Sequence, residues 1–229
     1  MLFNALKIKP KKLYKYLSSE GAKAFFKNPS LWFRLGNKLN DFYDMNPIGS
    51  DGAELGSIGI LSLSETAISA PMWAHYGSNG NGVVLEFDTD SNFFKQYPLN
   101  KVNYHWHRLS IKELPQAITF KNSEWSYERE WRCLTTPYDE NGKFLSREQA
   151  IQIPFSPTAL TSLIFGYDCS VTHEAMAFLR KSSFSHVKPY VCRANSYNYG
   201  FKVLEPNDVT YLLEQQNAIR HYRNYKRDK

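Results

Sequence analysis

Trp125-Ser126-Tyr127-Glu128-Arg129-Glu130-Trp131-Arg132 alternates charged and aromatic side chains, and this alternation is the best guide to the fold class. In a strand, side chains two residues apart share a face and lie about 6 to 7 Å from one another. The pattern therefore predicts a strand over residues 125–132. We expect Glu128, Glu130 and Arg132 to face solvent or a cleft, while aromatic side chains such as Trp131 fasten the opposite face to a core.

Other short apolar or alternating runs extend this prediction to a whole sheet. Strands are predicted at 13–17, 31–34, 57–64, 83–87, 160–165, 187–192 and 201–204, and helices at 19–26, 70–76, 111–118, 172–181 and from about 207. Ser18 or Ser19 is the expected cap of the first helix, and Thr172 that of the helix at 172–181. Together, these strands and helices predict an α+β protein with a mostly antiparallel sheet and flanking helices.

Composition limits the classes of protein that this chain can be. With 229 residues and 42% hydrophobic residues it can bury one full core, so a single domain over 1–229 is predicted. Its three cysteines are widely spaced, which argues against a disulfide framework or a structural zinc site. The absence of a long apolar run predicts no membrane contact and a cytoplasmic location, with delivery to another cell without a cleaved signal left open.

Positive charge gathers near both ends of the sequence. The net charge is +6, and lysines and arginines crowd segment 1–12 and the predicted helix at 207–229. Charge runs of this kind are usually solvated, but they also attract polyanions such as nucleic acid. Both interpretations stay open.

Glu128 and Glu130 form the most suggestive pair of titratable residues. Two like charges at this spacing raise the pKa of one member, and a carboxylate beside a sugar ring stabilises the positive charge that develops when a glycosidic bond breaks. Chemistry at a ribose is therefore one prediction. The alternative is a solvated strand face on which Arg132 balances Glu130.

Two further groups carry polar or aromatic side chains at suitable spacings. Ser62 and Ser64 share a strand face, where they would bind a ribose or neighbouring backbone. Trp73 and Tyr76 lie three residues apart on a predicted helix, with His75 beside them, and such rings either sandwich a planar heterocycle or pack into a core.

Asn40, Asp41, Asp44 and Asp51 offer oxygen ligands in a turn-rich segment. They lack the ordered spacing and the fixed glycine of a calcium loop, so no metal is expected. A metal-dependent hydrolase or nuclease that uses Asp41, Asp44, His75 and Glu128 is kept as an alternative.

Six motifs together resemble a bacterial family called domain of unknown function 2971. They are Leu13-Tyr14-Lys15-Tyr16, Leu39-Asn40-Asp41-Phe42-Tyr43-Asp44, Met72-Trp73-Ala74-His75-Tyr76, Gly82-Val83-Val84-Leu85-Glu86-Phe87, the stretch from Trp125 to Arg132, and Ile164-Phe165-Gly166. This resemblance runs from about residue 13 to about 166. The family name implies no chemistry.

A more distant resemblance, to ADP-ribosyltransferases of the toxin type, does imply chemistry. Ser62-Leu63-Ser64 and Glu128-Arg129-Glu130 are similar to the second and third motifs of those enzymes, and Tyr14-Lys15-Tyr16 stands where the first would lie. The resemblance implies a split antiparallel sheet and NAD as substrate. Glu130 would then be the catalytic carboxylate and Glu128 the group that acts on the acceptor.

The same resemblance implies the groups that bind NAD and the biological setting. NAD-binding residues would be Tyr14, Lys15, Tyr16, Ser62, Ser64, Trp73, His75 and Tyr76. The expected protein is an ADP-ribosyltransferase or NAD glycohydrolase, serving as a toxin, effector or phage-defence protein with a protein or nucleic acid as acceptor. The alternative is a module that binds a nucleotide or nucleic acid without turnover.

Overall fold

The chain, seen here in a computed structural model, falls into two compact units, each assembled from three stretches of sequence. Unit 1 comprises Met1–Lys11, Ser30–Glu65 and Thr89–Ser156, and unit 2 comprises Lys12–Pro29, Thr66–Asp88 and Pro157–Lys229. The structure describes residues 9–36, 39–41, 43–44, 58–108, 118–136, 138, 150–195 and 198–205. The predicted helices near 111 and from 207, Asp51 and most of the basic segment 1–12 lie outside the described residues, and the single domain stays a prediction.

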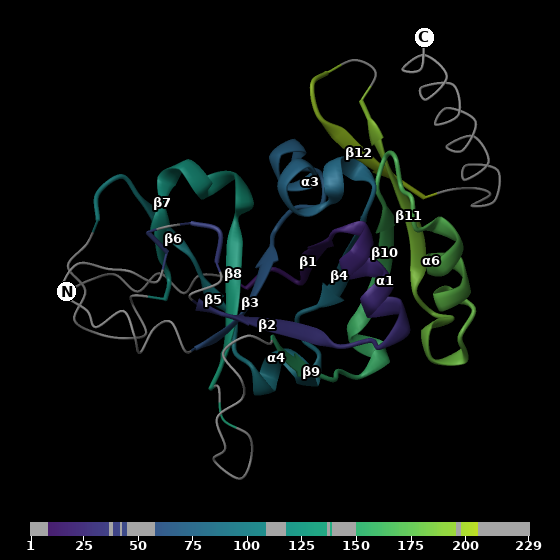
Figure 1. Ribbon diagram of the computed structural model, residues 1–229, viewed down its shortest axis with the longest axis horizontal. Coiled ribbons are helices and arrows are strands. Elements are labelled where there is room, and N and C mark those ends of the chain that lie inside the picture. Colours follow the sequence, from purple (N-terminus) through teal and green to yellow (C-terminus); the bar gives the residue numbers. More distant parts are fainter. Residues whose placement is uncertain are drawn as a thin grey trace. The chain divides into compact units, whose positions relative to one another are not determined.

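Unit 1 is built around an antiparallel sheet in the order β5-β8-β3-β2-β9 (Figure 1). Its elements are β2 (Leu31–Leu35), β3 (Gly59–Ser64), α4 (Asn92–Gln96), β5 (Asn100–Lys101), β6 (Asn103–His105), β7 (Phe120–Asn122), the 3-10 helix η3 (Ser123–Glu128), β8 (Glu130–Thr135) and β9 (Ile151–Ile153). Strands β6 and β7 form a separate parallel pair.

The core of unit 1 follows from the period of two in β2. Leu31, Phe33 and Leu35 are buried, whereas the two residues between them are exposed. Phe33 contacts the ring of Phe93 on α4, with 6.3 Å between centroids. Alternate apolar residues thus fix which face of the sheet turns inward.

Unit 2 contains a mixed sheet in the order β12-β11-β10-β4-β1. Its elements are β1 (Lys12–Leu17), α1 (Ser19–Lys27), α3 (Ala70–Tyr76), η2 (Ser78–Gly80), β4 (Val83–Asp88), η4 (Pro157–Ala159), β10 (Leu160–Phe165), α6 (Thr172–Leu179), η5 (Ser182–Phe184), β11 (Lys188–Ala194) and β12 (Phe201–Leu204). Every pairing within it is antiparallel except that of β10 with β11, which α6 connects.

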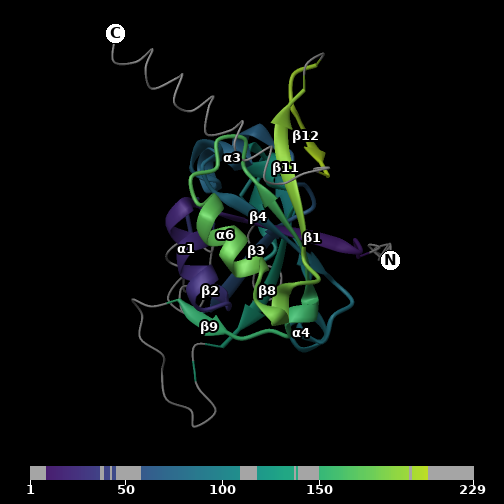
Figure 2. The same cartoon turned by 90° about the vertical axis from the view of Figure 1, so that its right-hand side faces the viewer.

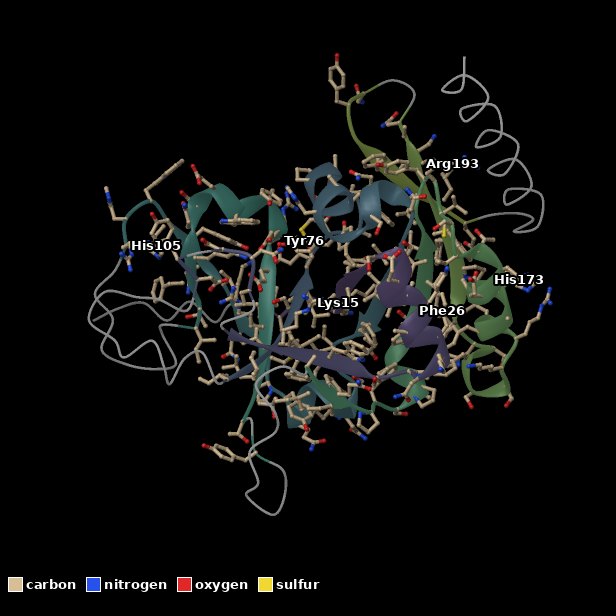
Figure 3. The ribbon with its side chains drawn as sticks, in the orientation of Figure 1. Lys15, Phe26, Tyr76, His105, His173 and Arg193 are labelled. Atoms are coloured by element: carbon tan, nitrogen blue, oxygen red, sulfur yellow. The ribbon has the colours of Figure 1, made fainter. Side chains whose placement is uncertain are left out.

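Helices α1 and α6 of unit 2 pack against each other through aromatic side chains. The rings of Phe26 and Phe178 lie 5.1 Å apart, and Figures 1 and 2 show the two helices side by side. Figure 3 shows Phe26 between them, while His173 points outward from α6. The Oγ atom of Ser18 accepts a hydrogen bond from Gly21 N and caps α1, as predicted.

The structure confirms an α+β protein with mostly antiparallel sheets. Two local predictions were wrong. Residues 123–128 form a 3-10 helix, so the strand begins only at Glu130, and the residue that caps α6 is Val171, because Thr172 is already helical. Among the described helices, none has the length and apolar character needed to cross a bilayer.

Candidate functional site: a buried charge cluster on β3, β7 and β8

Strands β3 and β8 bring the serine pair and the charged residues together in unit 1. Their antiparallel register sets Ser62 opposite Arg132 and Ser64 opposite Glu130. The side chains of Glu130 and Arg132 share a face, as the alternation predicts. The expectation that this face looks outward was wrong, because Arg132 is fully buried and Glu130 is 4% exposed.

The 3-10 helix η3 connects β7 to β8 (Figure 1), and its last residue, Glu128, contacts Lys121. The side-chain oxygen of Asn122 caps it by accepting from Glu124 N, and the helix ends at Arg129, whose φ of 45° lies in the left-handed region. Residues three apart in a 3-10 helix stand in line. Trp125 and Glu128 therefore occur on one side of η3, and both contact Lys121.

Arg132 organises the cluster because each of its N–H groups has an acceptor. Its Nη1 and Nη2 atoms donate to the two oxygens of Asp44, and Nε and Nη2 donate to those of Glu130, at 2.9 and 3.0 Å. Nη1 also donates to the carbonyl oxygen of Ile118, with 2.7 Å between the nitrogen and the oxygen. A guanidinium has five donors, so this one is saturated.

Lys121 on β7 links the carboxylates. Its Nζ atom lies 2.5 Å from Glu128 Oε2, 3.2 Å from Glu130 Oε2 and 3.7 Å from Asp44 Oδ2. The same ammonium lies 4.9 Å from the ring centroid of Trp125. Lys121, Arg132, Asp44, Glu128 and Glu130 are called the charge cluster below. Among these described residues, three carboxyl groups meet two basic side chains.

Opposite charges in the cluster hold Glu130, Lys121 and Arg132 in their charged forms. Burial by itself would raise the pKa of Glu130, but Arg132 and Lys121 outweigh it and hold that pKa well below its usual range. Burial likewise opposes the charge on Lys121 and Arg132, yet the carboxylates raise the pKa of both. At neutral pH the predicted catalytic carboxylate of Glu130 is therefore ionised.

Hydroxyl groups complete the surroundings of the two glutamates. Ser64 Oγ donates to the carbonyl oxygen of Glu128 at 2.6 Å, and Ser62 hydrogen-bonds to the side chain of Glu130. The Oη atom of Tyr104 accepts from Glu130 N at 2.8 Å. Burial, and then the nearby carboxylates, raise the pKa of Tyr104, so its hydroxyl stays protonated.

Tyr14, Lys15 and Tyr16 lie on β1 in unit 2. Tyr14 hydrogen-bonds to Glu86, and burial followed by the charge of Glu86 raises the pKa of Tyr14 to about 12. Tyr16 is buried and donates to the carbonyl oxygen of Thr66 at 3.0 Å. Lys15 lies between these tyrosines in the strand, so it belongs to the opposite face.

The aromatic group of α3 is divided between core and surface. Trp73 is fully buried, its Nε1 atom donates to Ala67 O at 2.9 Å, and its ring packs edge-on against Tyr16 at 5.3 Å. Trp73 is therefore a core residue in this structure, which agrees with the second of the two interpretations of this group. His75 is exposed, Tyr76 is half-buried, and their ring centroids are 6.2 Å apart.

The described residues also bear on the metal alternative. Asp41 is buried and its Oδ1 atom accepts from Tyr43 N at 2.9 Å, while Asp44 and Glu128 contact cationic side chains. Within the described ranges, no group of three or more His, Cys, Asp and Glu side chains is arranged to hold a metal ion.

Comparison with known protein families gives a match over part of the chain. Residues 72–133 match the model of a family described as protein of unknown function (DUF2971). The matched part contains the motifs at 72–76, 82–87 and 125–132, so the predicted resemblance is confirmed over this part of the chain. Lys121, Glu128, Glu130 and Arg132 all lie within it. No curated protein and no solved structure matches the chain.

The sequence reasoning missed two members of the site. Lys121 lies on β7, which has only three residues and is too short to show an alternation of apolar and polar side chains. Tyr104 lies on β6, for which no strand was predicted. A usable signal existed for η3, because Asn122 followed by Ser123 and Glu124 resembles a helix start. Arg132 was expected to contact only Glu130. Its contact with Asp44, which lies 88 positions away in the sequence, was not predicted.

Proposed function

We propose that this protein cleaves the bond between nicotinamide and ribose in NAD, as an ADP-ribosyltransferase or an NAD glycohydrolase. The observation that carries the proposal is the register of β3 with β8, which sets Ser64 opposite Glu130 while η3 adds Glu128 to the same cluster. Two serines on β3, Glu130 on β8 and Glu128 on η3 are thus close together although distant in sequence, and this arrangement supports the proposal.

Glu130 supplies the electrostatic part of the reaction. When the bond from ribose C1′ to the nicotinamide nitrogen breaks, nicotinamide leaves as a neutral molecule with the bonding electron pair, and positive charge develops on the ribose. A fixed carboxylate beside that ring stabilises the charge. The lowered pKa of Glu130 keeps it ionised for this role.

In this proposal Glu128 acts on the acceptor, as its general base. A hydroxyl, an amine or a water molecule bonds to C1′, and its proton passes to the carboxylate of Glu128. Lys121 holds Glu128 Oε2 at 2.5 Å, so that oxygen becomes available only when the ion pair opens. Ser64, which holds the backbone of Glu128, is a positioning residue.

The test is release of nicotinamide from NAD by the full chain, with and without protein and nucleic-acid acceptors. Glu130→Gln should reduce release by about 10²-fold or more, because the amide no longer stabilises positive charge. Glu128→Gln should reduce transfer to an acceptor more than it reduces NAD cleavage.

Glu124→Gln is the matched control, because Glu124 lies on η3 but is exposed. Circular dichroism of each variant separates lost chemistry from lost folding. A folded wild-type chain that releases no nicotinamide with any acceptor would contradict the proposal, as would a folded Glu130→Gln variant with full activity.

A further inference from the structure

The last residue of β6 in unit 1 and the three residues after it are all exposed. They are His105, Trp106, His107 and Arg108, and Trp106 is 81% exposed. Figure 3 labels His105 at this position. We call these residues the basic aromatic patch. An indole this exposed gains little from burial in its own fold, so its flat faces are open to a ligand.

Both flanks of the patch are anchored, although Trp106 itself is exposed. The ring of His105 packs 4.9 Å from that of Phe120 on β7, which pairs with β6. At the other end, the guanidinium of Arg108 lies 5.2 Å from the ring centroid of Tyr43. The backbone that carries Trp106 is therefore held from both sides, which lowers the entropy lost when its ring is covered.

The chemistry of the patch fits an anionic ligand with planar rings. Arg108 carries a positive charge, the two imidazoles offer N–H donors, and positions 105–108 contain no carboxylate. Single-stranded nucleic acid supplies phosphates and unpaired bases together, whereas the bases of a duplex are already stacked on each other. A peptide of acidic residues would satisfy Arg108 but would leave the indole without a partner.

We infer that the basic aromatic patch binds single-stranded nucleic acid, with a base stacked on Trp106 and a backbone phosphate at Arg108. This binding needs neither NAD nor the charge cluster, so it stands or fails separately from the proposed cleavage reaction.

The test is fluorescence anisotropy of a labelled 12-nucleotide oligo-dT and of oligo-rU with the full chain, in the absence of NAD. Trp106→Ala should weaken binding about 5- to 150-fold, the effect of losing one stacked base. Arg108→Ala should weaken binding and lower the slope of log affinity against log salt by about 0.7, as expected for one phosphate contact.

Tyr199→Ala is the matched control, because Tyr199 is also a fully exposed aromatic residue and lies in unit 2. It should leave binding unchanged, and Glu130→Gln should also retain binding as long as it folds. The inference is overturned if the wild-type chain does not bind either oligonucleotide in about 50 mM salt. It is equally overturned if Trp106→Ala binds within twofold of wild type, since the contact would then lie elsewhere.

Discussion

Arg132 shows at the scale of a single residue why the charge cluster can exist inside unit 1. A buried ion loses several kcal/mol of hydration, and only complete hydrogen bonding to charged partners offsets that loss. Arg132 reaches this state through Asp44, Glu130 and the carbonyl of Ile118. A lysine at position 132 would offer a point charge without the planar fork that holds two carboxylates at once.

Removing Lys121 should destabilise the fold strongly. Lys121→Met removes the cation that contacts all three buried carboxylates of the cluster, and breaking a buried pair costs about 3–5 kcal/mol. Urea denaturation followed by circular dichroism measures the change in the free energy of unfolding.

Lys23→Met is the control for that measurement. Lys23 is 58% exposed and its Nζ atom lies 3.8 Å from Glu174, so its loss should cost less than about 1 kcal/mol. Equal losses in the two variants would show that the cluster contributes no more than a surface ion pair.

At the scale of elements, the strands were predictable where an apolar period was present. β1, β2, β4, β10 and β12 appear within a residue or two of the predicted bounds, because buried side chains repeat along them. The prediction failed at residues 125–129, where the alternation of charged and aromatic residues suggested a strand but a 3-10 helix forms. The Asn122 cap and the left-handed Arg129 mark the two ends of this helix.

The site was predictable only in its strand-borne part. Ser62, Ser64 and Glu130 lie on the paired strands β3 and β8, whereas Glu128 reaches them from η3, which was not predicted. The ion pairs that bury them depend on Asp44 and Lys121, which approach from loops and a short strand. No local pattern in the sequence encodes contacts of that range, so the burial of the glutamates could not be foreseen.

Ser64 should be essential to the junction between β3 and η3. Ser64→Ala leaves the buried carbonyl oxygen of Glu128 without this donor, and a buried acceptor that loses its partner costs about 1–3 kcal/mol. Chemical denaturation measures the loss.

The control at this junction is Ser126→Ala, on the exposed side of η3, where a change within about 0.5 kcal/mol is expected. If Ser64→Ala were as stable as Ser126→Ala, the hydrogen bond would not be what holds Glu128 against β3.

At the scale of the whole molecule, both units bury carboxylates that are kept ionised. In unit 2, Glu86 accepts from Lys12 at 2.8 Å, Thr161 at 2.7 Å and Ser162 at 3.0 Å. Burial would raise the pKa of Glu86, but these donors outweigh it and lower that pKa. Each unit therefore has an interior whose stability depends on the charge of a glutamate.

This dependence gives the whole chain a defined response to pH. Glu130 and Glu86 have lower pKa values in the folded chain than the ordinary 4.5, so their contribution is present above that pH and is lost as the pH falls below it. Lys121 has a raised pKa, so its contribution is present below its ordinary 10.5 and is lost at higher pH. Stability should therefore be level between these values and fall on both sides.

Urea denaturation from pH 3 to 9 tests the acid side of this response. Each carboxylate with a lowered pKa adds up to about 1.4 kcal/mol per pH unit to the slope below 4.5. Glu130→Gln removes one such group, so its free energy of unfolding should fall less steeply with acid than that of the wild type. Glu124→Gln, which removes an exposed carboxylate of η3 outside the charge cluster, is the control. The same slope in all three proteins would mean that Glu130 gains its charge stabilisation equally in the unfolded chain, which the saturated contacts with Arg132 argue against.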